Sequence, residues 1–209
     1  MGLTYSLGYN LTRLVARMLF RIRIYGRENI IEEGPALLAM NHQSFLDPPL
    51  AGICCRREIF YLARKTLFDV PVLGLLLRRL NVIGVDREGS DVSALKSVIR
   101  VIRDGGCTIV FPEGTRSRDG GLQRGRPGAG LIIAKTLAPV VPMRVFGAFK
   151  AFPRDAKFPR PHPVTIVIGE PLRFTAADVE GPAREAYQRL SDQVMARIAA
   201  LKNPRELAE

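Results

Sequence analysis

The chain has 209 residues, 47% of them hydrophobic, which is enough for one domain with a well-filled core. Its 31 Lys and Arg outnumber its 20 Asp and Glu, and the net charge of +11 favours anionic partners: lipid headgroups, phosphorylated substrates or nucleic acid. No apolar run reaches the ~18 uncharged residues of a membrane-spanning helix, and none leads into the small-residue cleavage site of a signal peptide.

Residues 7–22 carry an apolar stripe at helical spacing, which predicts an amphipathic helix. The stripe consists of Leu7, Leu11, Leu14, Val15, Met18, Leu19 and Ile22. Arg13, Arg17 and Arg21 follow at four-residue steps along its flank, and no acidic residue precedes Glu28. Such a helix can lie in the headgroup layer of an anionic membrane. The alternative is a helix that packs on the protein's own core.

The rest of the chain alternates strand-like and helix-like segments. Strands are predicted over 22–25, 36–40, 59–63, 81–85, 108–111, 140–146 and 164–168. Helices are predicted over 48–55, 70–79, 91–104, 129–137 and 182–201. This alternation predicts an α/β fold in which residues 26–209 form a single domain with a mixed, mostly parallel sheet flanked by helices. Residues 1–25 precede it as a membrane-contacting segment with the amphipathic helix.

Two segments fit this pattern less well. Residues 67–80 are very apolar but too short to span a bilayer, so they are either a buried helix or a patch that contacts lipid or an acyl chain. Residues 147–163 are rich in Pro, Arg and Lys and are predicted to be a loop. Functional side chains are expected in loops at strand ends.

The cysteines and histidines do not form a metal-binding pattern. The chain has three Cys and two His, without a CxxC pair, so the sequence predicts no zinc site, no other metal and no cofactor. Adjacent Cys54 and Cys55 are interpreted as buried core thiols in a reducing compartment. A redox or nucleophilic role is the alternative.

The segment 41–47, NHQSFLD, directly follows an apolar strand-like run. Asp47-Pro48 is typical of a helix start, with Asp as N-cap and Pro at the first position. If the chain turns after His42, the Asp47 carboxylate can reach one nitrogen of the imidazole. The carboxylate then fixes the tautomer, and the other nitrogen can act as a general base. The alternative is that Asp47 is only a cap and His42 a hydrogen-bonded loop residue.

The segment 111–117, FPEGTRS, also follows a strand-like run and carries groups that suit an anion. These groups are a planar guanidinium, hydroxyl donors and backbone amides that glycine leaves accessible. Arg116 supplies the guanidinium, Thr115 and Ser117 the hydroxyls, and Gly114 the accessible backbone. Two more arginines, Arg124 and Arg126, follow shortly after the segment. A predicted helix begins just afterwards, and helix N-termini attract phosphate. The alternative is an exposed polar loop.

With these two segments, the chain resembles the 1-acylglycerol-3-phosphate acyltransferase family of the glycerolipid acyltransferase group. Residues 41–47 match its NHxSxxD block and residues 111–117 its FPEGTRS block, both in full, and residues 140–143 resemble its Val-Pro block. The G-x-x-x-x-x-R block is matched only in part. Asn81 stands where the family has glycine, although the Val-Asp-Arg ending with Arg87 is kept.

The resemblance implies transfer of a fatty acyl group from acyl-CoA or acyl carrier protein to the free hydroxyl of lysophosphatidate. It implies His42 as the general base and Asp47 as its orienting partner, with direct attack and no covalent enzyme intermediate. The implied phosphate-site residues are Arg87, Glu113, Gly114, Thr115, Arg116 and Arg126. Because a carboxylate repels a phosphate, Glu113 is predicted to organise an arginine or a backbone turn.

The implied setting is the cytoplasmic face of the cell membrane, with a lysophospholipid acceptor and an anionic lipid surface as partners. Glycerol 3-phosphate or another lyso-lipid is an alternative acceptor, and a non-catalytic lipid- or nucleic-acid-binding protein is a more distant alternative. Nucleic acid is not an expected partner, because aromatic residues are only 7% and no helix-turn-helix, zinc-finger or RNP pattern occurs.

Overall fold

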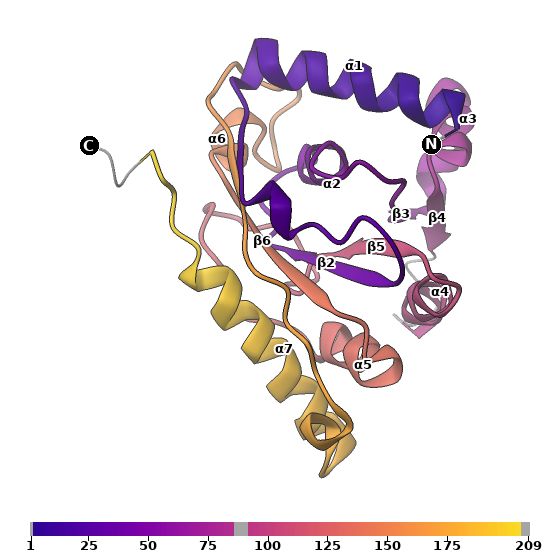
Figure 1. The fold of residues 1–209 in the computed structure, drawn as a ribbon. Coiled ribbons are helices and arrows are strands. Elements are labelled where there is room, and N and C mark those ends of the chain that lie inside the picture. Colours follow the sequence, from indigo (N-terminus) through magenta and orange to yellow (C-terminus); the bar gives the residue numbers. More distant parts are fainter. Residues whose placement is uncertain (1, 86–91, 206–209) are drawn as a thin grey trace.

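The computed structural model of the chain describes residues 2–85 and 92–205 (Figure 1). These residues form seven strands: β1 (Arg23–Tyr25), β2 (Ala36–Met40), β3 (Tyr61–Arg64), β4 (Val82–Val85), β5 (Cys107–Val110), β6 (Val140–Phe146) and β7 (Thr165–Ile168). Five of the strands form a sheet in the order β1-β7-β6-β2-β5, and β3 pairs with β4. Of these strand pairs only β6–β7 is antiparallel, which confirms the predicted mixed, mostly parallel sheet.

The described residues also form helices between the strands. The α-helices are α1 (Leu3–Phe20), α2 (Asp47–Gly52), α3 (Pro71–Arg79), α4 (Val92–Arg103), α5 (Pro127–Thr136), α6 (Ala148–Ala151) and α7 (Ala183–Ala200). Short 3-10 helices are η1 (Arg27–Asn29), η2 (Lys65–Asp69) and η3 (Ala176–Val179). Proline stands in the first two positions of α2, α3 and α5, where its missing N–H has no helical partner to lose.

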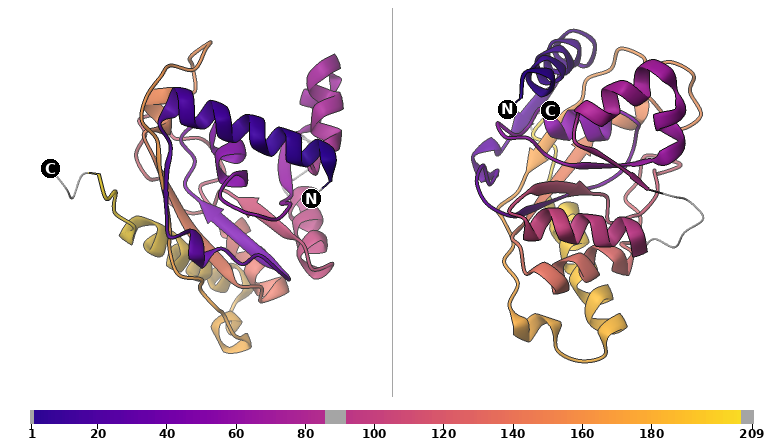
Figure 2. Two further views of the ribbon diagram at one scale, coloured as in Figure 1. Left: turned by 45° about the horizontal axis from the view of Figure 1, so that its top comes forward. Right: turned by 90° about the vertical axis from the view of Figure 1, so that its right-hand side faces the viewer.

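Helices cover both faces of the sheet. Successive strand residues point to opposite faces, so an all-apolar strand such as β2 has side chains to bury on both. On one face, Leu38 and Met40 of β2 pack with α1, α2 and α6. On the other face, Leu37 and Ala39 pack with α4, α5 and α7. Figures 1 and 2 show the two layers, with α1 and α2 on one side of the sheet and α5 and α7 on the other. Burial on both faces explains why this strand reads as a continuous apolar run.

The predicted strands and helices are present, with differences at their ends. The N-terminal helix begins at Leu3 and ends at Phe20, because Arg21 adopts a left-handed conformation with φ of 40°. Ile22 therefore lies outside the helix. The segment 147–163, predicted as a loop, contains the short helix α6. Its alanines are fully buried in the core, a tertiary contact that a Pro- and Lys-rich composition does not indicate.

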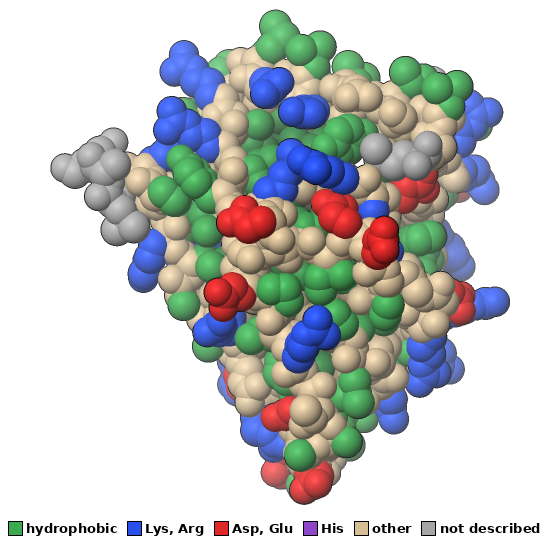
Figure 3. All heavy atoms as spheres, viewed as in Figure 1, with side chains coloured by type: hydrophobic (Ala, Val, Ile, Leu, Met, Phe, Trp, Pro, Cys, Tyr) green, Lys and Arg blue, Asp and Glu red, His purple; other side chains and the backbone are tan. Residues whose placement is uncertain are grey.

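Helix α1 packs on the domain through one face only. Tyr5, Ala16 and Phe20 are its buried residues. The predicted apolar stripe faces outward, with exposed fractions of 64% at Leu7, 63% at Leu11, 55% at Leu14 and 73% at Met18. Figure 3 shows hydrophobic side chains along the upper edge of the molecule, over α1. Within the described residues, no helix combines the length and the apolarity needed to cross a bilayer.

Candidate active site

The two motif segments leave the sheet at the same edge. Strands β2 and β5 are adjacent and parallel, with Ala39 opposite Val110, so residues 41–47 and 111–117 both follow the carboxyl ends of neighbouring strands. Strand β2 also pairs in parallel with β6 on its other side. The connection after β2 contains α2 and the connection after β5 contains α5, and these two helices pack on opposite faces of the sheet. A switch point of this kind is where α/β sheets bind ligands.

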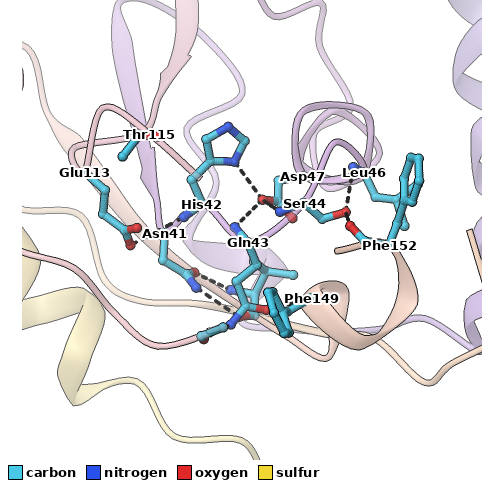
Figure 4. Close-up of polar contacts among 12 residues, drawn as sticks. Asn41, His42, Gln43, Ser44, Leu46, Asp47, Glu113, Thr115, Phe149 and Phe152 are labelled. Atoms are coloured by element: carbon cyan, nitrogen blue, oxygen red, sulfur yellow. Dashed lines mark hydrogen bonds and ion pairs between the residues drawn. The ribbon is translucent and has the colours of Figure 1, made fainter. Parts of the chain in front are cut away.

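His42 and Asp47 are in direct contact (Figure 4). Nδ1 of His42 lies 2.8 Å from Oδ2 of Asp47. The same oxygen accepts the backbone N–H groups of Gln43 and Ser44, each at 2.6 Å. Because an ionised carboxylate only accepts hydrogen bonds, Nδ1 carries the proton and Nε2 has the lone pair. Within residues 2–85 and 92–205 no hydrogen bond uses Nε2, so this nitrogen is available to a substrate proton.

Asp47 does not cap α2, so the N-cap prediction was wrong. The helix begins at Asp47 itself, after Leu46, and no side chain caps this end. The carboxylate turns back toward the preceding turn instead, because the N–H groups of Gln43 and Ser44 point at it. Burial raises the pKa of the fully buried Asp47 carboxyl, and His42 and the two amides lower it. The contact with His42 therefore helps to hold a charge at this buried position.

Phe111 holds the His42 ring from a second direction. The two rings stack with centroids 3.9 Å apart and planes 17° from parallel. A ring that is stacked on one face and hydrogen-bonded at Nδ1 has little rotational freedom, so its free nitrogen is oriented before substrate binds. The His42 side chain keeps an exposed fraction of 18%, which leaves one edge open.

Asn41 anchors the end of β2 to β6. Its amide oxygen accepts the N–H of Val145 at 2.7 Å, and its amide nitrogen donates to the carbonyl of Val145 at 3.1 Å. The Asn41 side chain is buried and thus continues the β2–β6 ladder beyond the strand. No role for Asn41 was predicted from the sequence. The one feature that could have indicated a structural role is that this polar residue directly follows a buried strand.

Gln43 and Ser44 fix the turn that follows His42. Gln43 Nε2 donates to the carbonyl of Gly120 at 2.6 Å, and the Ser44 hydroxyl donates to the carbonyl of Phe152 at 2.8 Å. Figure 4 shows the His42 ring and the Gln43 side chain pointing away from each other. The turn is therefore held by the backbone of two segments that are distant in sequence, and the motif alone does not indicate these contacts.

Glu113 connects the two motif segments. Its Oε1 accepts the backbone N–H of His42 at 3.4 Å, and its Oε2 accepts Nε2 of Gln123 at 3.0 Å. Gln123 also donates to the carbonyl of Thr115 at 3.2 Å. These contacts organise a backbone turn, one of the two functions expected of Glu113. Burial raises the pKa of Glu113 to about 7. No sequence pattern pointed to Gln123.

Gly114 and Arg126 lie against each other beside this turn. Gly114 has φ of +68°, which glycine adopts readily, and a Cβ there would lie 2.8 Å from Cδ of Arg126. Arg126 is exposed, stands just before α5 and donates its backbone N–H to the carbonyl of Pro112 at 2.8 Å. The structure thus brings Gly114, the neighbouring Thr115 and Arg126 together, next to a helix N-terminus.

Arg116 lies against the segment 41–47, which carries His42. The N–H of Ser117 donates to the carbonyl of His42 at 2.7 Å, and the guanidinium carbon of Arg116 is 3.4 Å from the centre of the Phe45 ring. No sequence pattern pointed to this contact between Arg116 and Phe45. Arg87, predicted as a further phosphate ligand, lies outside the described residues.

Known proteins are similar to this chain in sequence and in fold. Residues 21–146 match the family model described as Acyltransferase. The chain belongs to the acyltransferase family. It is 32% identical over 164 residues to a chloroplast 1-acyl-sn-glycerol-3-phosphate acyltransferase of Arabidopsis thaliana, covering 77% of this chain and 46% of that protein. It is 27% identical over 201 residues to a 1-acyl-sn-glycerol-3-phosphate acyltransferase of Bacillus subtilis, covering 95% of this chain and 97% of that protein.

A solved structure shares the fold of this acyltransferase-family chain. The 1-acyl-sn-glycerophosphate (LPA) acyltransferase PlsC from Thermotoga maritima matches with a TM-score of 0.76 and 24% identity, over 95% of this chain and 81% of that one. The chain spans about half the length of the chloroplast relatives that it matches. The comparisons confirm the family resemblance that the two full motif blocks indicated.

The cysteines of this acyltransferase-family chain lie away from solvent. Cys54, Cys55 and Cys107 are buried and free. Burial raises the pKa of Cys54 and of Cys107 to about 12, so both thiols stay protonated near neutral pH. Their burial agrees with the interpretation of Cys54 and Cys55 as core residues.

Proposed function

We propose that this acyltransferase-family chain transfers a fatty acyl group from an acyl thioester to the free hydroxyl of lysophosphatidate, giving phosphatidate. The observation that carries the proposal is the His42–Asp47 contact beside the FPEGTRS loop. Similarity to 1-acyl-sn-glycerol-3-phosphate acyltransferases supports it. The proposed donor is acyl-CoA or acyl carrier protein, and either anionic molecule suits a net charge of +11.

In the proposed reaction, His42 is the general base. Its Nε2 takes the hydroxyl proton while the hydroxyl oxygen attacks the thioester carbonyl carbon and a C–O bond forms. When the tetrahedral intermediate collapses, the C–S bond breaks and His42 returns the proton to the leaving thiolate. Asp47 stabilises the imidazolium that exists between the two steps. The enzyme itself is not acylated, and the protonated, buried thiols of Cys54 and Cys107 agree with this route.

The phosphate of the acceptor is proposed to bind beside His42. A guanidinium can hold two phosphate oxygens at once, and neighbouring amides, hydroxyls and cations add to the attraction. The proposed phosphate-site residues are Arg87, Gly114, Thr115, Arg116 and Arg126. Glu113 would keep their loop in shape through its contacts with the His42 backbone and Gln123. The free hydroxyl of the glycerol unit would then reach Nε2 of His42.

An acceptor panel tests the proposal. Purified protein and one acyl-CoA are assayed for thiol release with lysophosphatidate, glycerol 3-phosphate and lysophosphatidylcholine, and lysophosphatidate is expected to react fastest. His42→Ala should abolish release while a thermal melt still shows a cooperatively folded protein. Arg116→Gln should raise KM for lysophosphatidate about 10- to 150-fold, as expected for a lost charge-assisted hydrogen-bonding group. Arg118→Gln, an exposed neighbour, is the control. Substantial activity of His42→Ala would overturn the mechanism.

We further propose that the protein works on the cytoplasmic face of the cell membrane and contacts it through residues 1–25. Helix α1 directs Leu7, Leu11, Leu14 and Met18 outward, and basic residues flank them. Leu67, Val70 and Leu75 are also exposed, as the surface-patch alternative for residues 67–80 predicts. Apolar side chains in the acyl boundary and cations among anionic headgroups together give reversible binding.

Vesicle binding tests the membrane contact. Leu11→Gln combined with Met18→Gln should weaken binding to anionic vesicles at least about tenfold, because each inserted apolar side chain contributes on the order of 1 kcal/mol. Leu137→Gln is a matched control: Leu137 has an exposed fraction of 41% but follows α5, on the opposite side of the sheet from α1 (Figure 1). Equal binding of wild type and the double variant would contradict the proposal.

A further inference from the structure

Phe45 lies between the catalytic pair in sequence, yet it faces the other motif. It is the fifth residue of NHQSFLD and has an exposed fraction of 53%. The guanidinium carbon of Arg116 lies 3.4 Å from the centre of its ring. Single exposed apolar side chains are common on protein surfaces, so the contacts of Phe45 decide its role. Here it contacts the guanidinium proposed to bind the acceptor.

The distance defines how the two groups meet. A separation of 3.4 Å is about the contact distance of two carbon atoms, so no guanidinium nitrogen has room to point at the ring. The Arg116 guanidinium therefore lies face to face on Phe45. Stacking uses the face of a guanidinium and leaves its N–H groups in the plane, directed outward. Bidentate binding of a phosphate needs that in-plane edge.

The backbone on both sides of the stack is anchored. On the Phe45 side, the Ser44 hydroxyl donates to the carbonyl of Phe152 and accepts the N–H of Leu46 at 3.1 Å (Figure 4). The Phe45 ring also rests against the Phe152 ring, with centroids 5.9 Å apart. On the other side, the N–H following Arg116 is bonded to the carbonyl of His42. The ring is thus a fixed support beneath a guanidinium that is tied to the general base.

We propose that Phe45 is a positioning residue that holds the Arg116 guanidinium with its N–H edge toward the phosphate of the acceptor. The inference rests on the proposed function, because it assumes that Arg116 binds the phosphate of the acceptor. An unsupported arginine side chain would lose rotational freedom when it binds phosphate, and the stack has already restricted that freedom. Phe45 therefore acts on acceptor affinity, and the proton transfer at His42 does not depend on it.

Steady-state kinetics with three variants of Phe45 test the inference. Phe45→Leu keeps an apolar side chain but removes the π face, and it should raise KM for lysophosphatidate about 5- to 30-fold with kcat nearly unchanged. Phe45→Tyr and Phe45→Trp keep the face and should stay close to wild type. A side chain that only contacts lipid predicts the opposite order, with leucine tolerated. Normal KM in Phe45→Leu would overturn the inference.

A double-mutant cycle separates this inference from the proposed function. In the Arg116→Gln background, Phe45→Leu should add no further increase in KM, because the partner of the ring is gone. If Arg116→Gln alone leaves KM unchanged, the proposed phosphate site is wrong. If Arg116→Gln raises KM but Phe45→Leu does not, only the positioning role is wrong. Additive increases in the double variant would also refute coupling between the two side chains.

Fluorinated phenylalanines at position 45 keep the test valid even if Phe45→Leu folds poorly. Successive fluorine atoms withdraw electron density from the ring face but hardly change its size, so packing on Phe152 is preserved. The logarithm of KM for lysophosphatidate should rise in steps with fluorine number, while kcat and the melting temperature stay constant. A flat series would show that the ring serves only as a spacer, and it would overturn the inference.

Discussion

The charge of Asp47 can be removed with little change of shape, which makes Asp47→Asn a sharp test of the catalytic pair. In wild type, one carboxylate oxygen accepts His42 Nδ1 at 2.8 Å and the amides of Gln43 and Ser44 at 2.6 Å each. The carbonyl oxygen of an asparagine side chain can accept the same three donors. The new amide nitrogen would then occupy the position of Oδ1, which is buried and has no partner. The turn should survive the substitution.

The expected loss follows from the charges. With Nδ1 and Oδ2 2.8 Å apart, the charge centres of imidazolium and carboxylate are separated by about 4 Å, which at an effective dielectric constant of ~20 corresponds to ~4 kcal/mol. In the proposed mechanism, this interaction stabilises the imidazolium of the intermediate and is absent from the neutral ground state. Asp47→Asn should therefore lower kcat by about a thousandfold. Because Oδ1 is already unpaired in wild type, the free energy of unfolding should change by less than about 1–3 kcal/mol, the cost of newly unpairing a buried group.

The assay is initial-rate thiol release from acyl-CoA, with a thermal melt of every variant. Asp119→Asn is the matched control, because Asp119 is an exposed carboxylate that accepts the Ser117 hydroxyl in the neighbouring loop. It should leave kcat near wild type. A folded Asp47→Asn variant with kcat within tenfold of wild type would refute the electrostatic role of the carboxylate.

Two further predictions concern the supporting contacts. Burial raises the pKa of Glu113 from 4.5 to about 7, so ionisation favours the unfolded chain, and stability should fall as pH rises from about 4.5 to 7. The expected fall is about 1–2 kcal/mol. Glu113→Gln should lack this fall in urea unfolding, and parallel pH profiles of the two proteins would contradict the reasoning. Asn41→Ala should destabilise by about 2–4 kcal/mol, because it leaves the N–H and carbonyl of Val145 unpaired in the interior, and chemical denaturation would measure this. An unchanged midpoint would show that the Asn41 contacts are dispensable.

The local elements were predictable because their signals are local. The run Ala-Leu-Leu-Ala-Met is apolar at every position, and burial on both faces requires such a run in a parallel strand. The stripe on residues 7–22 predicted a helix, which the structure extends to Leu3. His42 and Asp47 could be suggested as partners because only five residues separate them and a turn brings them together. Proline at the helix starts acts through its own missing N–H.

The contacts that make a site of these elements depend on tertiary structure. The N–H of Val145 is bonded to Asn41 across 104 residues of sequence, and the carbonyl of Phe152 to Ser44 across 108. The Asp-Pro pair suggested a cap, but the Asp47 carboxylate binds the amides behind it, because the folded turn directs two N–H groups to one buried oxygen. Nothing in the FPEGTRS segment indicates that Arg116 stacks on Phe45.

The sequence by itself indicated the seven strands and all of the α-helices except α6, and it showed which chemical groups follow the ends of β2 and β5. Periodicity, proline positions and the two motif blocks are properties of neighbouring residues, so they can be recognised in the sequence alone. Only the tertiary structure decided that β5 lies beside β2, that Phe111 stacks on His42 and that Arg116 lies over the Phe45 ring. Strand order and side-chain contacts arise because the apolar faces of all helices and strands must be buried together. This condition depends on the whole chain and not on any local segment.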